Sequence, residues 1–454
     1  MTLTTLFLPC AAGVEELLAA EVARLLPGVA AQARRGGVEL PGGASEAMAL
    51  NHGSRLAQRV LWPVADAPFF AEDDLYEMAR AVRWGDWITP QHTIKVDVTA
   101  QRAPLKSLNF AALRIKDGVC DRLREDTGER PSVDTWRPDL PLLLHLTPER
   151  ATLYVDTSGE SLFKRGWRQD QGEAPLKETL AAAMLAAAGW QGREEDGPLL
   201  DPVCGSGTIA IEAAQLACGI APGSLRRFAF ERLAPFREAA AQRAWRELRE
   251  AARAAVHAPL VAVFAGDVSF RMTDFATRNA DRAGVMGAID FKTVDALQRP
   301  APAQQGTLML NPPYGERIDP KGSRGGARGG EHGGDRGGDR GGERGGPVGS
   351  YGSPRGPARG ERSAMPGADR AERMAREGFE GGASAGDFFS RLASHWKHAY
   401  PGWTAWVLSP DMKLPQAMRL KESRRVPMWN GPIECRLFRF DLVAGSMRPV
   451  PVET

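Results

Sequence analysis

Two short stretches carry the residue types and the spacing from which chemistry can be expected. Residues 201–209 read Asp-Pro-Val-Cys-Gly-Ser-Gly-Thr-Ile, and residues 311–314 read Asn-Pro-Pro-Tyr. Gly205 and Gly207 allow a sharp turn in which no side chain separates the backbone from a ligand. Apolar residues before the first stretch and alanine-rich residues after it predict a strand, a glycine turn and a helix. The N-terminus of that helix favours a carboxylate.

The glycine spacing separates two classes of cofactor. The dinucleotide fingerprint G-x-G-x-x-G places its third glycine at the position of Ala210. Alanine is tolerated there, but the preceding Asp201 and Pro202 are unusual for that fingerprint. We therefore predict an S-adenosylmethionine loop.

The Asn-Pro-Pro-Tyr stretch predicts a place where a planar amine is held. Its prolines stiffen the loop and leave backbone carbonyls uncommitted. The Asn311 side-chain oxygen and the Pro312 carbonyl can then accept hydrogen bonds from an exocyclic NH2 group, while Tyr314 stacks on the ring. Proximity and in-line orientation towards a methyl sulfonium would supply most of the rate enhancement. The alternative is a turn without chemistry, because Asn-Pro is a common turn dipeptide.

The elements around these stretches alternate between strands and helices. Such alternation predicts an α/β fold with a parallel sheet, in which ligands lie at the carboxyl ends of the strands. Asp267 is placed to accept ribose hydroxyls and Asp295 to accept an adenine amino group, with a loop aspartate and a helix cap as the alternatives. The predicted strands span residues 259–265, 289–294 and 307–310, and polar residues follow their ends: Asp201, Asp267, Asp295 and Asn311.

The first 155 residues have an α+β pattern. We expect one strand over residues 34–40, a hairpin of 142–146 with 151–155, and a helix over 109–124. Basic and amide side chains on and near that helix predict either a solvated face or a face that contacts RNA phosphates, and the pattern leaves both open. These residues are Arg102, Lys106, Asn109, Arg114 and Lys116.

Composition excludes several classes of protein. The 454 residues carry 58 Lys+Arg against 56 Asp+Glu, so any basic surface must be local. Five scattered cysteines without a C-x-x-C pair indicate reduced thiols and a cytoplasmic protein, and no metal site is expected. No apolar run approaches the roughly 18 residues of a membrane span. Residues 320–380 are rich in Gly and Arg and predict a largely disordered insertion, with weak RNA tethering as the alternative.

Several stretches resemble the THUMP-containing 23S rRNA guanine-N2 methyltransferases of the RlmL type. They are residues 7–26, 73–77, 155–166, 174–178, 201–208, 311–317 and 430–437. The resemblance covers nearly the whole chain outside the insertion. It implies the following organisation: an N-terminal ferredoxin-like part at 1–55, a THUMP RNA-binding domain at 56–156, a linker at 157–174 and a Rossmann-like class I methyltransferase domain at 175–454.

The resemblance also implies a reaction, which is N2-methylation of a specific guanine in 23S rRNA or its large-subunit precursor. S-adenosyl-L-methionine would be the cofactor, without a metal or a membrane. Carried over by position, the cofactor-binding residues are Asp201, Gly205, Gly207, Asp267 and Asp295, and the catalytic residues are Asn311, Pro312, Pro313 and Tyr314.

The chain departs from the family pattern at a few places. Ser269 replaces an acid that often follows the ribose residue, Trp429 stands where tyrosine is usual, and the insertion begins just after Asp319. Some relatives carry a second methyltransferase domain that forms 7-methylguanine. This sequence contains no second glycine loop, so only the N2 reaction is expected. Other functions remain as alternatives: a tRNA guanine-N2 methyltransferase, a DNA adenine-N6 or protein glutamine methyltransferase, and a non-catalytic RNA-binding assembly factor.

Overall fold

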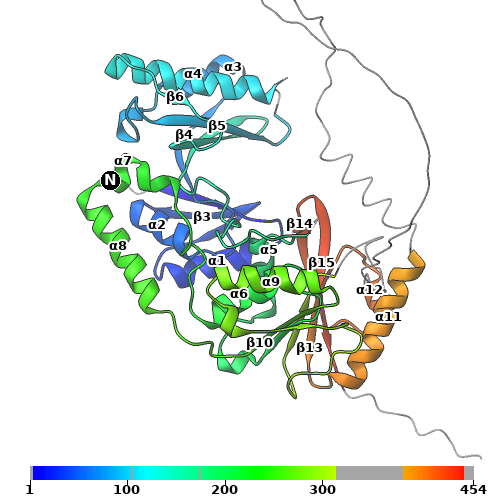
Figure 1. Ribbon diagram of the computed structural model, residues 1–454. Helices are drawn as coiled ribbons and strands as arrows, with labels where there is room; N and C mark the ends of the chain where they lie inside the picture. Colours follow the sequence, from blue (N-terminus) through cyan, green and yellow to red (C-terminus); the bar gives the residue numbers. More distant parts are fainter. Residues whose placement is uncertain (1–3, 104, 106, 173–174, 313–381, 444–454) are drawn as a thin grey trace, which may run out of the picture.

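The computed structural model describes residues 4–103, 105, 107–172, 175–312 and 382–443, with side chains from 387 onwards in the last range. The described residues form two β-sheets, one of eight strands and one of seven (Figure 1). The α/β fold class is therefore confirmed. The insertion predicted at 320–380 lies outside the described residues, as do Lys106, Pro313 and Tyr314.

The first sheet has the order β2-β3-β1-β4-β8-β7-β5-β6. The hairpin predicted at 142–146 and 151–155 is confirmed, since Leu142 pairs with Val155 in an antiparallel register. Its strands are β1 (Thr4–Pro9), β2 (Gln32–Arg34), β3 (Gly37–Gly42), β4 (Leu61–Pro68), β5 (Thr93–Ala100), β6 (Ser132–Val133), β7 (Leu140–Leu146) and β8 (Arg150–Asp156). Its helices are α1 (Glu15–Leu25), α2 (Ala44–Gly53), α3 (Glu72–Arg80) and α4 (Leu108–Thr127).

The single strand predicted over residues 34–40 is wrong. The chain reverses between β2 and β3, which pair antiparallel with Arg34 opposite Gly37. Gly36 lies in the turn with φ of 82°, a left-handed conformation that glycine adopts without strain. The paired glycines at 36 and 37 were therefore the signal of a hairpin.

The second sheet has the order β11-β10-β9-β12-β13-β15-β14, parallel from β11 to β13 and antiparallel at β15 and β14. The apolar run at 259–265 enters the sheet only at Val263, opposite Leu199 of the short β9. The strands are β9 (Leu199–Asp201), β10 (Val263–Asp267), β11 (Ile289–Thr293), β12 (Thr307–Leu310), β13 (Thr404–Ser409), β14 (Arg424–Asn430) and β15 (Ile433–Asp441). The helices are α5 (Glu178–Ala188), α6 (Thr208–Ala217), α7 (Ala234–Arg237), α8 (Ala239–Ala254), α9 (Phe270–Arg282), α11 (Gly382–Ala399) and α12 (Leu414–Met418).

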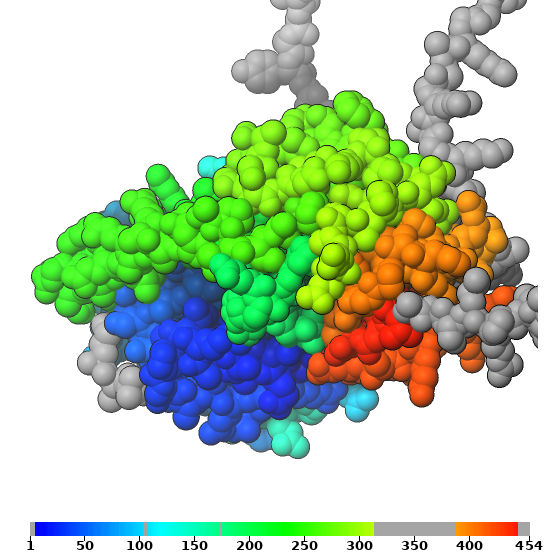
Figure 2. Space-filling view, turned by 90° about the horizontal axis from the view of Figure 1, so that it is seen from below, coloured from blue at the N-terminus to red at the C-terminus, as the bar shows by residue number. Residues whose placement is uncertain are grey.

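Helices cover both faces of this second sheet, as in doubly wound folds. Leu199 belongs to the apolar core shared with α5, α6 and α9, whereas Leu200 belongs to a separate core against α11. Figure 1 shows these two layers on opposite sides of the strands. In the space-filling view, the N-terminal surface lies directly beside the C-terminal hairpin (Figure 2). Consequently, residues far apart in the sequence share one contact region.

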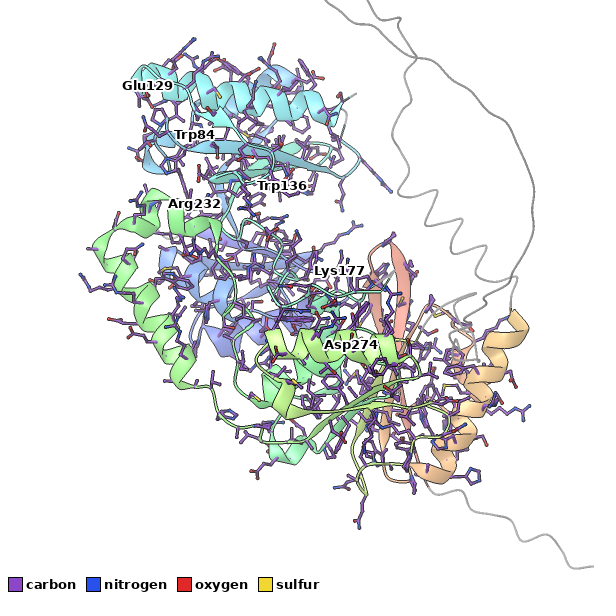
Figure 3. The ribbon with its side chains drawn as sticks, in the orientation of Figure 1. Trp84, Glu129, Trp136, Lys177, Arg232 and Asp274 are labelled. Carbon is purple, nitrogen blue, oxygen red and sulfur yellow. The ribbon has the colours of Figure 1, made fainter. Side chains whose placement is uncertain are left out.

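The segment around α7 and α8 joins the two halves of the chain. Arg232 donates from Nη1 to Asp139 Oδ1 at 2.7 Å, below the β5 and β6 part of the first sheet (Figure 3). The N–H of Ala234 donates to the carbonyl of Trp87 at 2.9 Å. Within the part of the chain that the structure describes, no helix combines the length and apolarity needed to cross a membrane.

Candidate functional site

The glycine turn lies at the carboxyl end of β9, between the ends of β10 and β12. Gly205 and Gly207 have φ of 53° and 88°, a region that other residues enter only with strain. A Cβ on Gly207 would lie 3.0 Å from the Cβ of Ala276, so α6 and α9 approach closely there. No atom of the described residues beyond the adjacent ones lies within 4 Å of a Cβ on Gly205. The space beside the turn is therefore open to a ligand.

Asp267 is the last residue of β10, and its carboxylate accepts a hydrogen bond from the glycine turn. Oδ2 accepts from the N–H of Gly205 at 3.0 Å, and Oδ1 accepts from the N–H of Ser269 at 2.9 Å. Burial raises the pKa of this carboxyl, and the two hydrogen bonds oppose that rise. A carboxylate offers about four acceptor sites, so it retains acceptors for sugar hydroxyls. The structure thus joins the predicted ribose residue to the predicted cofactor turn.

Asp201, at the end of β9, is 2% exposed. The pKa of its carboxyl is raised to about 8, chiefly by burial and in smaller part by the nearby Asp267, while the hydrogen bond from Val203 and the charge of Arg299 oppose the rise. Its Oδ1 accepts from the N–H of Val203 at 3.3 Å. The carboxyl is therefore mostly protonated at neutral pH, and it shapes the turn as a neutral group.

Arg299 follows β11 and is the buried cation of this region, with 3% exposure. A Cβ on Gly266 would collide with its Nη1, so only glycine admits the guanidinium at that point of β10. Neither Nη atom has a hydrogen-bond partner among the residues that the structure describes. Sequence reasoning missed this residue, because a single arginine after a strand carries no signal of its own.

Asp295 and Asn311 complete a row of polar residues at one edge of the sheet. Asp295 follows β11, and Asn311 follows β12 on the other side of β9. The Oδ1 of Asp295 accepts from the N–H of Leu297 at 2.9 Å within a turn at residues 296–298, so the helix cap expected as the alternative to adenine binding is not formed. Asn311 is half-buried and Pro312 is buried. The structure therefore brings the start of the Asn-Pro-Pro-Tyr stretch to the strand end next to the glycine turn.

A linker arginine that sequence reasoning missed holds both hydroxyls of the glycine turn. Arg168 donates to Ser206 Oγ at 2.9 Å and to Thr208 Oγ1 at 2.8 Å. Its Nε donates to Glu178 Oε1 at 2.8 Å, with the two side chains 12% and 3% exposed. A planar guanidinium can serve several acceptors at once, whereas an ammonium cannot match this geometry. Arg168 thus fixes the turn relative to α5.

Asn279 of α9 ties the same linker to the turn from the other side. Its Nδ2 donates to the carbonyls of Ser206 at 3.0 Å and Asp170 at 2.7 Å, and its Oδ1 accepts from the N–H of Gln169 at 3.2 Å. Asn279 is fully buried. A buried amide with these bonds holds the backbone of the turn in one position.

A buried ionic network connects the first sheet to α6. Glu212 of α6 is fully buried and accepts from Arg55 Nη1 at 3.2 Å and from Arg165 Nε at 3.0 Å. Arg165 Nη2 donates to the carbonyl of Arg55 at 2.6 Å. Glu21 of α1 accepts from the N–H of Arg55 at 2.9 Å. The helix that begins at the glycine turn is therefore anchored to the N-terminal half of the chain.

The basic residues near α4 differ in whether they already pair with other side chains of the protein. Arg102 and Asn109 are exposed, and Arg102 has φ of 52°. Arg114 donates to Asp73 at 2.5 Å and lies 4.6 Å from the ring centre of Tyr76, while Lys116 pairs with Asp117 at 2.7 Å. Two of the predicted RNA contacts are thus already paired within the protein.

Among the described residues, no group of three or more His, Cys, Asp or Glu side chains could hold a metal ion. The cysteines among the described residues are all free thiols and are buried.

Three family models match the chain in succession. The RlmL ferredoxin-like domain matches residues 5–61, the THUMP domain matches 71–156, and the UPF0020 methyltransferase domain, described as RMKL-like, matches 165–325. The curated "Ribosomal RNA large subunit methyltransferase K/L" of Shewanella pealeana is 32% identical over 402 residues, which are 87% of this chain and 47% of that protein. The chain spans about half the length of the curated relatives it matches.

Solved structures with the same fold extend over nearly the whole chain. SMU.472, assigned as a methyltransferase and solved with SAH, aligns with a TM-score of 0.74 at 23% identity and covers 97% of this chain and 98% of its own. A protein from Listeria monocytogenes, assigned as an N6-adenine-specific DNA methylase, aligns with a TM-score of 0.74 at 24% identity, covering 97% and 96%. At these identities the likeness shows the fold, and a fold does not select a substrate.

Proposed function

We propose that this chain, which matches the RlmL ferredoxin-like, THUMP and UPF0020 methyltransferase models in that order, transfers a methyl group from S-adenosylmethionine to N2 of a guanine in 23S rRNA. The similarity to proteins named for methylation of large-subunit ribosomal RNA supports the substrate. The reaction would take place in the cytoplasm, where ribosomal RNA is found.

The observation that carries the proposal is the arrangement at the carboxyl edge of the second sheet. The carboxylate of Asp267 accepts from the N–H of Gly205 at 3.0 Å, and Asn311 follows the strand on the opposite side of the turn. Ligands of doubly wound sheets bind at this edge. The proposed cofactor cradle and the proposed acceptor for an amine would therefore lie on adjacent strands.

The residues of this edge suit an adenosine cofactor. The open space beside Gly205 admits a ligand to the backbone, and Asp267 keeps acceptors for ribose hydroxyls. Asp295 would receive the adenine amino group, and Asp201 would shape the turn. S-adenosylmethionine, when bound, supplies a methyl group that is already activated on a sulfonium.

The protein's contribution to catalysis would be orientation. Asn311 and the Pro312 carbonyl would accept hydrogen bonds from the guanine amino group, which leaves the nitrogen lone pair directed at the methyl carbon. Pro313 and Tyr314 complete the proposed substrate stretch. Holding the reacting atoms in line accounts for a large part of the rate enhancement when the donor is already activated.

The N-terminal half would bind the RNA. The THUMP match covers residues 71–156, a region that includes β5, α4, β7 and β8. Arg102 and Asn109 are exposed there and are proposed to contact phosphates, together with Lys106, Arg114 and Lys116. The Arg55–Glu212–Arg165 network would hold this half in a fixed relation to the cofactor turn.

Radiolabelled S-adenosylmethionine offered to purified protein with rRNA, tRNA, DNA and protein substrates tests the proposal. The expected product is N2-methylguanosine, found after nuclease digestion of 23S rRNA and chromatography of the nucleosides. Label in DNA adenine or in protein glutamine would replace the proposed substrate, and a cofactor that does not bind would leave a non-catalytic RNA-binding protein.

A further inference from the structure

A pocket with a volume of about 250 Å³ lies where distant parts of the chain meet, and Gln58 is among its lining residues. The loop between β1 and α1 contributes Cys10 and Ala12, the start of α5 contributes Lys177, and the tip of the β14–β15 hairpin contributes Trp429. Figure 3 places Lys177 beside that hairpin, between the two sheets.

The size of the pocket restricts its ligand. Pockets for whole cofactors or drug-sized molecules have volumes of about 300–1,000 Å³. A smaller pocket of about 250 Å³ suits one planar ring system. Burial raises the pKa of the Cys10 thiol to about 12, so the pocket holds no thiolate nucleophile at neutral pH. Binding, and not covalent chemistry, is what this pocket offers.

The two functional walls of the pocket are an indole and an ammonium group. Trp429 is half-buried and packs against Gly13, where any Cβ would collide with the carbonyl of Pro427. The indole is therefore fixed between the hairpin and the N-terminal domain. Lys177 is exposed, with its Nζ 5.3 Å from the ring centre of Phe163, and no described carboxylate lies within ion-pair distance of it. An aromatic plane beside an unneutralised cation is the combination with which proteins bind single-stranded nucleic acid.

The hairpin tip that lines the pocket lies at the same edge of the second sheet as the proposed active site. β13 runs parallel to β12, and β15 returns antiparallel with Arg436 opposite Ser409 at the end of β13. The tip of the β14–β15 hairpin therefore projects beyond the carboxyl edge of the sheet. On the other wall, Glu178 follows Lys177 directly and binds Arg168, which holds the glycine turn. The pocket thus lies between the N-terminal half of the chain and the row of polar residues at the ends of the strands.

We propose that this pocket binds one nucleobase of the RNA near the target guanine, stacked on Trp429, with the adjoining phosphate at Lys177. The inference rests on the proposed function and adds a second nucleotide subsite to it. Such a subsite would hold the RNA strand on the path from the THUMP domain to the proposed active site. Base stacking tolerates any base, so the subsite would contribute affinity more than sequence specificity.

Substitutions in the full-length chain test the subsite with in vitro transcribed 23S rRNA as the probe. Trp429→Ala should weaken RNA binding about 5- to 150-fold, the usual range for loss of one stacked base. Trp429→Phe, which keeps an aromatic plane, should recover most of the affinity. Lys177→Gln should reduce the slope of log affinity against log salt concentration by about 0.7, because one phosphate contact is lost. Affinity for S-adenosylmethionine should not change in any of them.

Two further variants separate binding from folding. Ala12→Phe fills the pocket from the loop between β1 and α1 while all the other pocket residues remain, and it should weaken RNA binding without lowering the melting temperature. Lys421→Gln, at an exposed lysine outside the pocket, should leave RNA affinity and its salt slope unchanged. If Trp429→Ala and Ala12→Phe bind RNA as tightly as a wild type that methylates it, the subsite is wrong and the proposed function stands. A wild type that neither binds nor methylates RNA would overturn the proposed function itself.

Discussion

Arg168→Met should lower the free energy of unfolding and also weaken cofactor binding, and the two effects can be separated. The guanidinium donates to Ser206, Thr208 and Glu178 at 2.8–2.9 Å. Its loss leaves the Glu178 carboxylate, which is 3% exposed, without its cation. Breaking a buried ion pair by removing one partner costs about 3–5 kcal/mol of folding free energy. Burial already raises the pKa of Glu178, so proton uptake by that carboxyl limits the cost.

The double variant Arg168→Met with Glu178→Gln isolates the effect on the turn. Replacing both members of a buried pair is often nearly neutral, so most of the lost stability should return. The hydrogen bonds to the hydroxyls of Ser206 and Thr208 remain absent. At about 0.5–1.5 kcal/mol each, their loss should weaken cofactor binding by roughly 5- to 150-fold.

Urea denaturation and isothermal titration calorimetry with S-adenosylmethionine measure the two quantities separately. Arg168→Lys serves as the control, since it keeps the charge at Glu178 but cannot reach all three acceptors, and it should be intermediate in both. A double variant with wild-type stability and wild-type cofactor affinity would show that Arg168 is only a structural ion-pair partner.

Three further perturbations follow from the same contacts. Glu212→Ala should lower the free energy of unfolding by about 3–5 kcal/mol, because it leaves two buried guanidinium groups unpaired, whereas Glu39→Ala in an exposed pair should cost less than about 1 kcal/mol in the same urea titration. In the wild type, the Asp201 carboxyl with a pKa of about 8 keeps a proton that the unfolded chain releases, so the wild type loses stability as pH rises from about 4 to 8. Asp201→Asn lacks this titration and should therefore gain at least ~1 kcal/mol of stability relative to the wild type over that range. Equal pH profiles in thermal denaturation would contradict this. Asp267→Ala should weaken cofactor binding by about 1.5–3 kcal/mol, since it removes a charged acceptor from the Gly205 N–H, with unchanged RNA affinity in filter binding as the control.

The row of polar residues at the ends of the parallel strands could be predicted from the sequence, because it depends on local signals and one topological rule. Apolar runs ending in Asp201, Asp267 and Asn311 mark strands, and parallel strands place their carboxyl ends at one edge. The glycine turn was predictable for the same reason, since Gly205 and Gly207 adopt the positive φ that the motif requires. Each of these signals lies within a few residues of the feature it predicts.

The residues that hold the turn could not be predicted, because their partners are set by tertiary packing. Arg168 reaches hydroxyls 38 and 40 residues away, and Arg55 reaches Glu212 across 157 residues. No local pattern records such pairs, and the linker that contains Arg168 had the composition of a simple connection. The turn that Asp295 closes likewise depends on its neighbours in the fold, and the residue type alone also suits a helix cap. By contrast, the β2–β3 hairpin carried a usable signal in its paired glycines.

Single-turnover methyl transfer by Asn311→Ala tests the central claim most directly. Unmodified 23S rRNA and S-adenosylmethionine are both supplied at saturation, so the rate reports the chemical step and not binding. Loss of one acceptor for the guanine amino group should lower that rate on the order of a hundredfold, with N2-methylguanosine as the residual product and with unchanged affinity for both ligands. Asn311→Asp should keep part of the rate, because a carboxylate also accepts from NH2. A wild-type rate in Asn311→Ala would contradict the assignment of the catalytic edge.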